Sequence, residues 1–262
     1  MGSREKRGSG EKYRLLLRGM MALCVAGMII SAILLFLSRK EYAKGEAVYE
    51  QMQASLREQG KDKSGSDNQA EADSGEWAVD FDKLRETNAD VAGWIREEEG
   101  IIDYPIVQGE DNEYYLTHLF NHERNKLGSL FMDYRNNKGF ADKNTVIYGH
   151  NMKDGSMFSS LTKYKEQSYY DRFPKMILYT PEGNFTVEFF AGIVADGNYE
   201  FIRFQFADDE DFQSYINVLR EKSTFESSII AEQDDRIVTL STCTYEFDNA
   251  RYVLYGKLVP AN

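Results

Sequence analysis

Two side chains near the end of the chain could form a nucleophilic site. Cys243 directly follows the segment 235–242, whose β-branched residues favour a strand, and Arg251 opens a second strand-like segment, 251–259. If these segments form a hairpin around the loop 244–250, Cys243 and Arg251 lie at the same end of two adjacent strands. A guanidinium there favours the thiolate, which is the nucleophilic form of cysteine. It can also stabilise the oxyanion that forms when a thiolate attacks a carbonyl.

A third group must move protons, because an arginine keeps its own. His150 follows the strand-like segment 145–148 and precedes a polar loop, a position that suits a proton carrier at the exposed end of a strand. Spacing alone leaves open whether it reaches Cys243. His118 and His122 lie four residues apart, as in some zinc sites, but no second cluster of ligands is evident. We therefore expect surface or packing roles for this pair, and neither a metal nor a cofactor.

The other cysteine, Cys24, cannot pair with Cys243. It lies in the uncharged apolar segment 19–37, whereas a disulfide requires the two Cα atoms to lie within about 7 Å. If the domain that contains Cys243 lies outside the cytoplasm, its lone thiol is unusual, because cysteines usually pair in an oxidising compartment. Taken alone, Cys243 could be an inert buried thiol. Cys24 is expected to be an apolar residue facing lipid, with acylation as the alternative.

The segment 19–37 predicts a membrane anchor. Its 19 residues would cover about 28 Å as a helix, which is close to the thickness of the hydrocarbon core. A buried core helix rarely runs so long without a polar face, and a cleaved signal peptide usually has a shorter apolar region and a small-residue cleavage site. Residues 1–18 carry six basic and two acidic side chains. This bias predicts a cytoplasmic N-terminus and an extracytoplasmic remainder.

The expected organisation is a cytoplasmic basic tail at 1–18, a transmembrane helix at 19–37, an extracytoplasmic stalk or linker at 38–75 and one folded domain at 76–262. Residues 60–75 contain no large apolar side chain, which is typical of a flexible linker. Residues 41–59 could be helical, but Gly45 interrupts the pattern. The formal net charge of −12 argues against non-specific binding of nucleic acid.

The outer domain contains seven strand-like segments bounded by turn residues: 103–107, 128–133, 145–148, 176–180, 185–194, 235–242 and 251–259. A short helix is expected over 81–91, with Phe81, Leu84 and Val91 facing inward. An amphipathic helix is expected over 208–221. Its acidic start could be a calcium site, although helix capping is the simpler explanation. Many strands with few helices indicate a mainly β barrel or sandwich.

The local strings around the candidate residues resemble the signature of the sortase family. TLSTC ends at Cys243, Arg251 opens the next strand, and YGHN surrounds His150 far upstream. Similarity to the class B branch comes from the stretches 103–116 and 128–136 and from the helix before the cysteine strand. The resemblance extends over residues 77–259. It implies a closed eight-stranded β-barrel with an N-terminal helix and a helix inserted before the cysteine strand, preceded by one transmembrane helix.

The same resemblance implies a membrane-anchored cysteine transpeptidase of a Gram-positive bacterium. Cys243 corresponds to the nucleophile, His150 to the general acid and base, and Arg251 to the residue that holds the oxyanion or positions the substrate. Such enzymes cut a C-terminal sorting signal of secreted proteins after a threonine and form a thioacyl enzyme. They then pass the acyl group to an amine on a lipid-linked peptidoglycan precursor. Of the roles known in class B relatives, wall anchoring is favoured over pilus assembly.

Further substrate contacts are expected from Asn112, Leu116, Tyr148 and Ser241. In some class B members an acidic residue directly follows the cysteine. Thr244 stands there in this chain, with Glu246 two positions later, so the role of that acidic residue is not carried over.

Three other functions fit parts of the pattern. The same residues could serve a cysteine hydrolase with water as the acceptor. A non-catalytic surface binding domain would leave Cys243 buried and inert. A cytosolic thiol redox protein is disfavoured, because no CxxC motif is present and the predicted anchor opposes that location.

Overall fold

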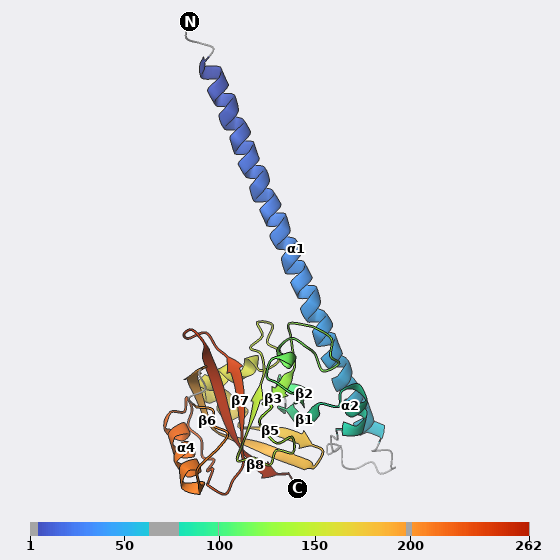
Figure 1. Cartoon of the computed structure of the whole chain (residues 1–262), viewed down its shortest axis with the longest axis vertical. Helices are drawn as coiled ribbons and strands as arrows, with labels where there is room; N and C mark the ends of the chain where they lie inside the picture. Colours follow the sequence, from blue (N-terminus) through green and yellow to red (C-terminus); the bar gives the residue numbers. More distant parts are fainter. Residues whose placement is uncertain (1–4, 63–78, 99, 198–200, 262) are drawn as a thin grey trace. The chain divides into compact units, whose positions relative to one another are not determined.

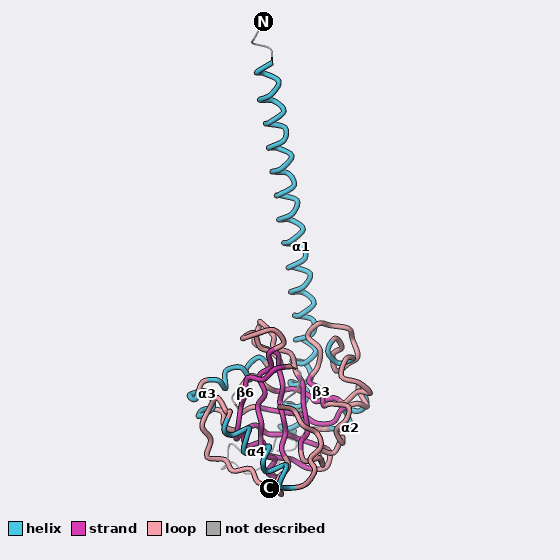
Figure 2. The backbone as a smooth tube through the Cα atoms, turned by 60° about the vertical axis from the view of Figure 1, so that its left-hand side comes forward, coloured by secondary structure: helices cyan, strands magenta, loops and turns pink. Residues whose placement is uncertain are grey.

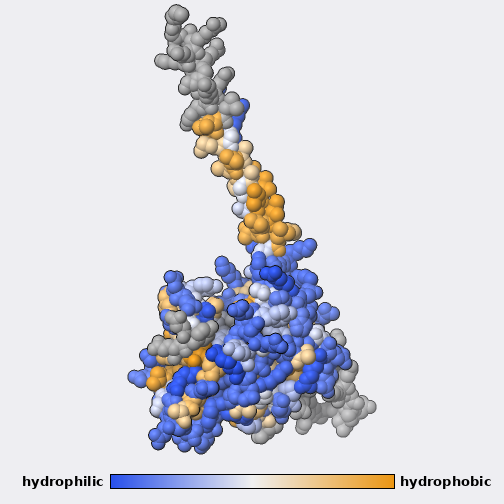
Figure 3. Space-filling model, in the orientation of Figure 1, coloured by the Kyte–Doolittle hydropathy of each residue, from blue (hydrophilic) through white to orange (hydrophobic). Residues whose placement is uncertain are grey.

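The computed structural model describes residues 5–62, 79–98, 100–197 and 201–261, and the chain divides into two units, 1–44 and 45–262 (Figure 1). One helix, α1 (Glu5–Asp62), runs through the boundary between them. Within it, the segment Leu16–Ser55 contains a stretch long and apolar enough to cross a membrane. The large apolar side chains between Leu16 and Leu37 are exposed, and Figure 3 shows this stretch as hydrophobic. The predicted spanning segment is therefore a helix, while its orientation stays a prediction.

The second unit is built around eight strands that close into a barrel (Figure 2). The strands are β1 (Val91–Arg96), β2 (Asp103–Val107), β3 (Leu130–Met132), β4 (Asn144–Tyr148), β5 (Lys175–Thr180), β6 (Gly183–Asp196), β7 (Ile237–Cys243) and β8 (Ala250–Pro260). Their order around the barrel is β1-β2-β3-β4-β7-β8-β6-β5. The pairs β2–β3 and β4–β7 are parallel, and the other neighbours are antiparallel. The expected closed eight-stranded barrel is confirmed.

The amphipathic helix expected before the cysteine strand is present as α4 (Asp209–Glu221). Phe212, Ile216 and Leu219 are buried in one apolar cluster with residues of β6, as their helical spacing predicts. Asp208 caps the helix, because its side chain accepts a hydrogen bond from the Asp211 backbone N–H at 2.8 Å. Helix capping therefore accounts for the acidic start of this segment.

The helix predicted over 81–91 is longer than the helix in the structure. Helix α2 (Phe81–Thr87) ends before Asn88, whose backbone is extended, with φ −150° and ψ 111°. The Asn88 side chain donates hydrogen bonds to the Phe120 carbonyl at 2.7 Å and to the Tyr115 hydroxyl at 2.9 Å. These tertiary contacts end the helix, so Val91 begins the buried strand β1 instead of completing a helical face. The short helices η1 (Tyr114–Leu116), η2 (Ser159–Lys165) and α3 (Gln167–Arg172) were also not predicted.

Part of the expected linker is packed against the barrel. Gly45 does not interrupt α1 and is buried, and a Cβ at this position would lie 2.9 Å from Leu127 Cδ2. A larger residue there would have to displace the ends of the Leu127 and Asn125 side chains, so glycine permits the close approach of the helix to this loop. One turn later, Tyr49 is only 2% exposed. Residues 45–62 thus belong to the same compact unit as the barrel. The expected domain start at residue 76 lies outside the described residues.

Candidate active site

The hairpin of β7 and β8 brings Cys243 and Arg251 together. The two residues are direct partners in the antiparallel register, at the end where the loop 244–249 joins the strands. Arg251 Nη1 donates a hydrogen bond to Cys243 Sγ at 2.9 Å, and both side chains are half-buried. The sequence-based prediction that a cation lies beside the thiol is confirmed.

His150 reaches the same edge of the barrel through the parallel pair of β4 and β7. Tyr148 lies opposite Ser241 in this pair. Two residues beyond each of these positions stand His150 and Cys243, and parallel strands leave a sheet in the same direction. Asn151 extends the pairing, because its Nδ2 donates a hydrogen bond to the Cys243 carbonyl at 2.8 Å. The histidine and the cysteine are therefore placed at one edge by backbone pairing.

The ring of His150 is held by the backbone of η1. Its Nε2 lies 2.8 Å from the Leu116 carbonyl oxygen. A carbonyl oxygen can only accept a hydrogen bond, so Nε2 carries the proton in this arrangement. In the neutral ring, Nδ1 then has the lone pair that can accept a proton. The contact with Leu116 thus leaves Nδ1 as the ring nitrogen that is free to exchange a proton.

All seven residues that the sequence analysis selected line one pocket of about 130 Å³: Asn112, Leu116, Tyr148, His150, Ser241, Cys243 and Arg251. Phe131, Gly149 and Thr242 complete its lining. Leu116 and Phe131 make part of the wall apolar, whereas Cys243 and Arg251 add a nucleophile and a cation. A pocket of this composition can hold a small side chain beside a carbonyl group that the sulfur attacks.

Asp133 organises one wall of the pocket and was not selected from the sequence. Its Oδ2 accepts hydrogen bonds from Asn112 Nδ2 at 2.8 Å and from the Tyr148 hydroxyl at 3.0 Å. Arg135 pairs with both carboxylate oxygens at 2.8 Å. Burial raises the pKa of Asp133, but the hydrogen bonds from Arg135, Asn112 and Tyr148 outweigh it and lower the pKa below its usual value. The signal available in the sequence was an acidic residue at the end of the segment 128–133.

The loop after Cys243 is attached to η2 by a lysine that the sequence analysis also did not select. Lys165 Nζ pairs with the Glu246 carboxylate and donates a hydrogen bond to Thr244 Oγ1 at 3.1 Å. The Thr244 hydroxyl donates in turn to Glu246 Oε2 at 2.5 Å. Beyond this attachment, Tyr245 and Phe247 are 75% and 47% exposed. The loop therefore has a fixed base next to Cys243 and an exposed aromatic tip.

His118 and His122 do not share a helical face. Their rings surround Tyr114: His118 stacks on it with 4.0 Å between ring centroids, and His122 Nδ1 lies 3.3 Å from its hydroxyl. His122 has a left-handed backbone with φ +64°, which ends any helical turn there. Across residues 5–62, 79–98, 100–197 and 201–261, no group of three or more His, Cys, Asp or Glu side chains could hold a metal ion. The histidine pair is thus a packing feature of the loop.

Comparison with known proteins identifies the family. The sortase domain family matches residues 98–259. Sortase B of Listeria monocytogenes serovar 1/2a is 40% identical over 187 residues, which are 71% of this chain and 76% of that protein. The Staphylococcus aureus sortase B–substrate complex superposes with a TM-score of 0.74 at 28% identity, covering 85% of this chain and 99% of that one. A sortase B complexed with triglycine gives a TM-score of 0.72 at 30% identity, covering 83% and 98%.

The chain belongs to the sortase family, and its relatives and structural neighbours are of the sortase B type. Sortases are cysteine transpeptidases that attach surface proteins, so the protein is an enzyme of this class. The resemblance found in the sequence motifs is confirmed.

Proposed function

We propose that this protein cuts a C-terminal sorting signal after a threonine and transfers the new carboxyl end, through a thioester on Cys243, to an amine of a cell-wall precursor. The observation that carries this proposal is the hydrogen bond of 2.9 Å between Arg251 Nη1 and Cys243 Sγ, in a pocket that His150 also lines. A nucleophile, a fixed cation and a proton carrier are the three groups that acyl transfer needs.

In the first step, the Cys243 thiolate attacks the carbonyl carbon of the scissile amide. As the sulfur forms the C–S bond, its negative charge passes to the carbonyl oxygen. The Arg251 guanidinium, which donates to the sulfur in the resting site, then donates to this oxyanion. Because Arg251 stands in the strand register opposite Cys243, this donor needs no large movement to follow the charge.

His150 supplies the protons for both half-reactions. As the imidazolium, it protonates the leaving amine from Nδ1, so that the C–N bond breaks and the thioester remains on Cys243. The neutral ring then takes a proton from the incoming amine, which attacks the thioester carbon and releases the thiolate. Its Nε2 proton stays bound to the Leu116 carbonyl throughout, which keeps the ring in one orientation.

The remaining lining residues suit a peptide substrate. Ser241 is part of the lining, and its buried Oγ has no hydrogen-bond partner in the described part of the protein. Asn112 and Tyr148 are pre-positioned by Asp133, and Leu116 offers an apolar contact. The substrate complex of the S. aureus relative supports a binding site of this kind in the family.

The predicted anchor and the relatives support the proposed acceptor and location. The triglycine bound to the sortase B relative supports a peptide amine as the acceptor. The basic residues 1–18 favour a cytoplasmic N-terminus with the domain 76–262 outside. An anchor at 19–37 would hold the enzyme at the same membrane as the secreted substrate and a lipid-linked precursor. Tethering of this kind raises the effective concentration without tight binding. We favour attachment of proteins to the wall over pilus assembly.

The test is a transfer reaction with defined products. The full-length protein in detergent is incubated with a library of threonine-containing pentapeptide signals, with and without triglycine, and the products are identified by mass spectrometry. We expect a peptide–triglycine conjugate and a covalent adduct on Cys243, both of which are lost in Cys243→Ala. If the product is the free acid whether or not triglycine is present, the protein is a hydrolase and the proposal is wrong.

A further inference from the structure

We propose that Tyr49, on the helix that leads from the predicted membrane span, is a positioning residue for His150. Its hydroxyl holds the loop 115–129, and the Leu116 carbonyl of that loop holds the histidine ring. The inference rests on the proposed role of His150 as acid and base. It connects Tyr49 on α1 to the ring of His150, although the two residues are far apart in the sequence.

The Tyr49 hydroxyl is the centre of a buried hydrogen-bond network. It donates to the Gly128 carbonyl at 2.8 Å, lies 2.9 Å from Ser129 Oγ, and accepts from the Phe120 backbone N–H at 3.3 Å. The Tyr49 ring packs edge to face on Tyr104, with 5.4 Å between centroids. Burial raises the pKa of Tyr49, so the hydroxyl keeps the proton that it donates. Three points of the loop are therefore attached to one atom of the helix.

Gly128 transmits this attachment to the histidine. Its backbone is left-handed, with φ +63°, and a Cβ there would lie 2.9 Å from the Leu116 carbonyl oxygen and 3.1 Å from His150 Cδ2. Gly128 is thus packed against both partners of the Leu116–His150 hydrogen bond. The adjacent Ser129 N–H also donates to the Tyr115 carbonyl at 3.0 Å. A shift of the Gly128 carbonyl would therefore move the carbonyl that orients the ring.

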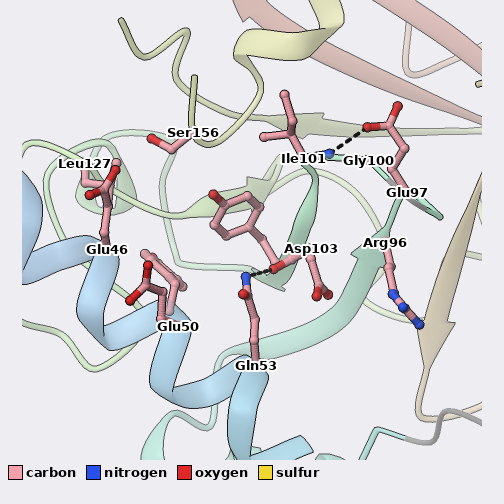
Figure 4. A pocket seen from close by; sticks show the side chains of 12 residues that line it. Glu46, Glu50, Gln53, Arg96, Glu97, Gly100, Ile101, Asp103, Leu127 and Ser156 are labelled. Atoms are coloured by element: carbon pink, nitrogen blue, oxygen red, sulfur yellow. Dashed lines mark hydrogen bonds between the residues drawn. The ribbon is translucent and has the colours of Figure 1, made fainter. Parts of the chain in front are cut away.

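The helix face that carries Tyr49 is fixed by its neighbours at a spacing of four residues. Gly45 lies against Leu127, and Gln53 Nε2 donates to the Asp103 carbonyl at 2.6 Å. Figure 4 shows this bond between two residues that line a cavity of about 390 Å³, which Glu46 and Glu50 of α1 also line. Beside this cavity, the polar contacts of Tyr49 and Gln53 and the packing of Gly45 hold the helix on the barrel.

The test compares Tyr49→Phe with Tyr170→Phe in the full-length protein in detergent micelles. Tyr170 is a matched control, because it is also buried, at 7% exposure, and its hydroxyl lies 2.7 Å from Ser227 Oγ, but it lies on α3. The protein is labelled with ¹⁵N-histidine, and the chemical shifts of both ring nitrogens of His150 report the tautomer. The pH profile of Cys243 alkylation by iodoacetamide, located by mass spectrometry, is the second measurement. Neither measurement needs a substrate, so each remains valid if the proposed transfer reaction fails.

We expect the wild-type ring and Tyr170→Phe to be in the Nε2–H form when neutral. Tyr49→Phe is expected to give a mixture of tautomers, an altered alkylation profile and, with a cleavable peptide, a fall in kcat of roughly five- to tenfold, the equivalent of one lost hydrogen bond. An unchanged tautomer in Tyr49→Phe, or the same change in Tyr170→Phe, would overturn the proposal. If Tyr49→Phe does not fold, Ser129→Ala removes the neighbouring hydroxyl. It must then shift the His150 signals away from the pure Nε2–H form toward a mixture of tautomers, and unshifted signals overturn the proposal.

Discussion

Arg251 and Cys243 are partners in the register of one antiparallel hairpin, and their side chains are joined by a hydrogen bond of 2.9 Å between Nη1 and Sγ. The position of the cation is therefore fixed by strand pairing, although both residues flank the loop 244–249. A guanidinium held in this way can remain beside the reacting atoms while the charge moves from sulfur to oxygen.

Replacing Arg251 by lysine should remove this function while keeping the charge. Lysine lacks the planar fork of donors, so it cannot reproduce the geometry of Nη1 toward both sulfur and oxyanion. We expect kcat to fall by about 10²- to 10³-fold, the effect typical of a lost oxyanion donor. The measurement is steady-state cleavage of a fluorogenic sorting peptide. Arg236→Lys is the control, because Arg236 Nη1 bonds the Phe140 carbonyl at 3.0 Å, outside the pocket, and its kcat should stay near that of the wild type.

Gly128→Ala should lower kcat, an effect that backbone strain alone would not cause. The added Cβ would lie 2.7 Å from the Tyr115 carbonyl oxygen and close to His150, in addition to forcing φ +63° on alanine. Gly155→Ala is the matched variant, because Gly155 has φ +97° but nothing within 4 Å of the added carbon. We expect Gly155→Ala to lose about 1–3 kcal/mol in the free energy of unfolding and Gly128→Ala to lose more, because only its Cβ meets backbone atoms, as denaturant titration can measure. Only Gly128→Ala should also lose kcat, and equal kcat in both variants would contradict this reading of the loop.

Asp133→Asn should weaken the fold in a pH-dependent way. The folded pKa of Asp133 is lowered, so the carboxylate stabilises the protein fully above its unfolded pKa of about 3.9, and this stabilisation is lost as the pH falls through the folded value. The Tm of Asp133→Asn should therefore lie below that of the wild type at pH 7. The difference should shrink below about pH 4, as thermal unfolding at a series of pH values can show.

Asp82→Asn is the control for that measurement. Asp82 pairs with Arg85 at 2.9 Å, but its side chain is 95% exposed. Exposed pairs contribute little to stability, so its Tm should follow that of the wild type at every pH. A Tm difference for Asp133→Asn that is constant between pH 7 and the acid range would rule out the proposed contribution of its ionised carboxylate.

Lys165→Met should increase hydrolysis of the proposed thioester relative to transfer. Without the contacts of Lys165 to Glu246 and Thr244, the loop that begins directly after Cys243 becomes more mobile, and water gains access to the acyl group. We expect the ratio of hydrolysis to transfer to rise about two- to fivefold, as fits the loss of one partly exposed ion pair. Chromatography of both products at a fixed triglycine concentration gives the ratio. Lys163→Met serves as the control, because Lys163 Nζ lies over the Tyr169 ring at 5.5 Å. A rise of equal size in Lys163→Met would exclude a specific role for the loop attachment.

Local patterns were enough to predict most of the barrel and the main residues of the site. The β7–β8 hairpin and α4 follow from periodicity within short segments, so Cys243 and Arg251 could be placed together without knowledge of the fold. The meeting of His150 with them depends on the parallel pair β4–β7. No local signal reports a parallel pair, and only the family resemblance suggested that His150 acts together with Cys243.

The features that were missed depend on long-range contacts. The end of α2 is determined by the hydrogen bonds of Asn88 to Phe120 and Tyr115, so the apolar spacing of 81–91 suggested too long a helix. The helical segment after Gly45 has a weak pattern, because Gly45, Tyr49 and Gln53 contact the barrel through a glycine, a hydroxyl and an amide. Hydrophobic periodicity does not detect a face of this composition.

The parallel pair of β4 and β7 also determines when the protein acquires its chemistry during folding. Between these strands the chain forms β5, β6 and α4, so the pairing closes a long loop at an entropic cost and is slow compared with local hairpins. Until that ladder forms, Cys243 has no histidine beside it, even if its own hairpin already supplies Arg251. We therefore expect competence for transfer to arise late in folding, with the closure of the barrel.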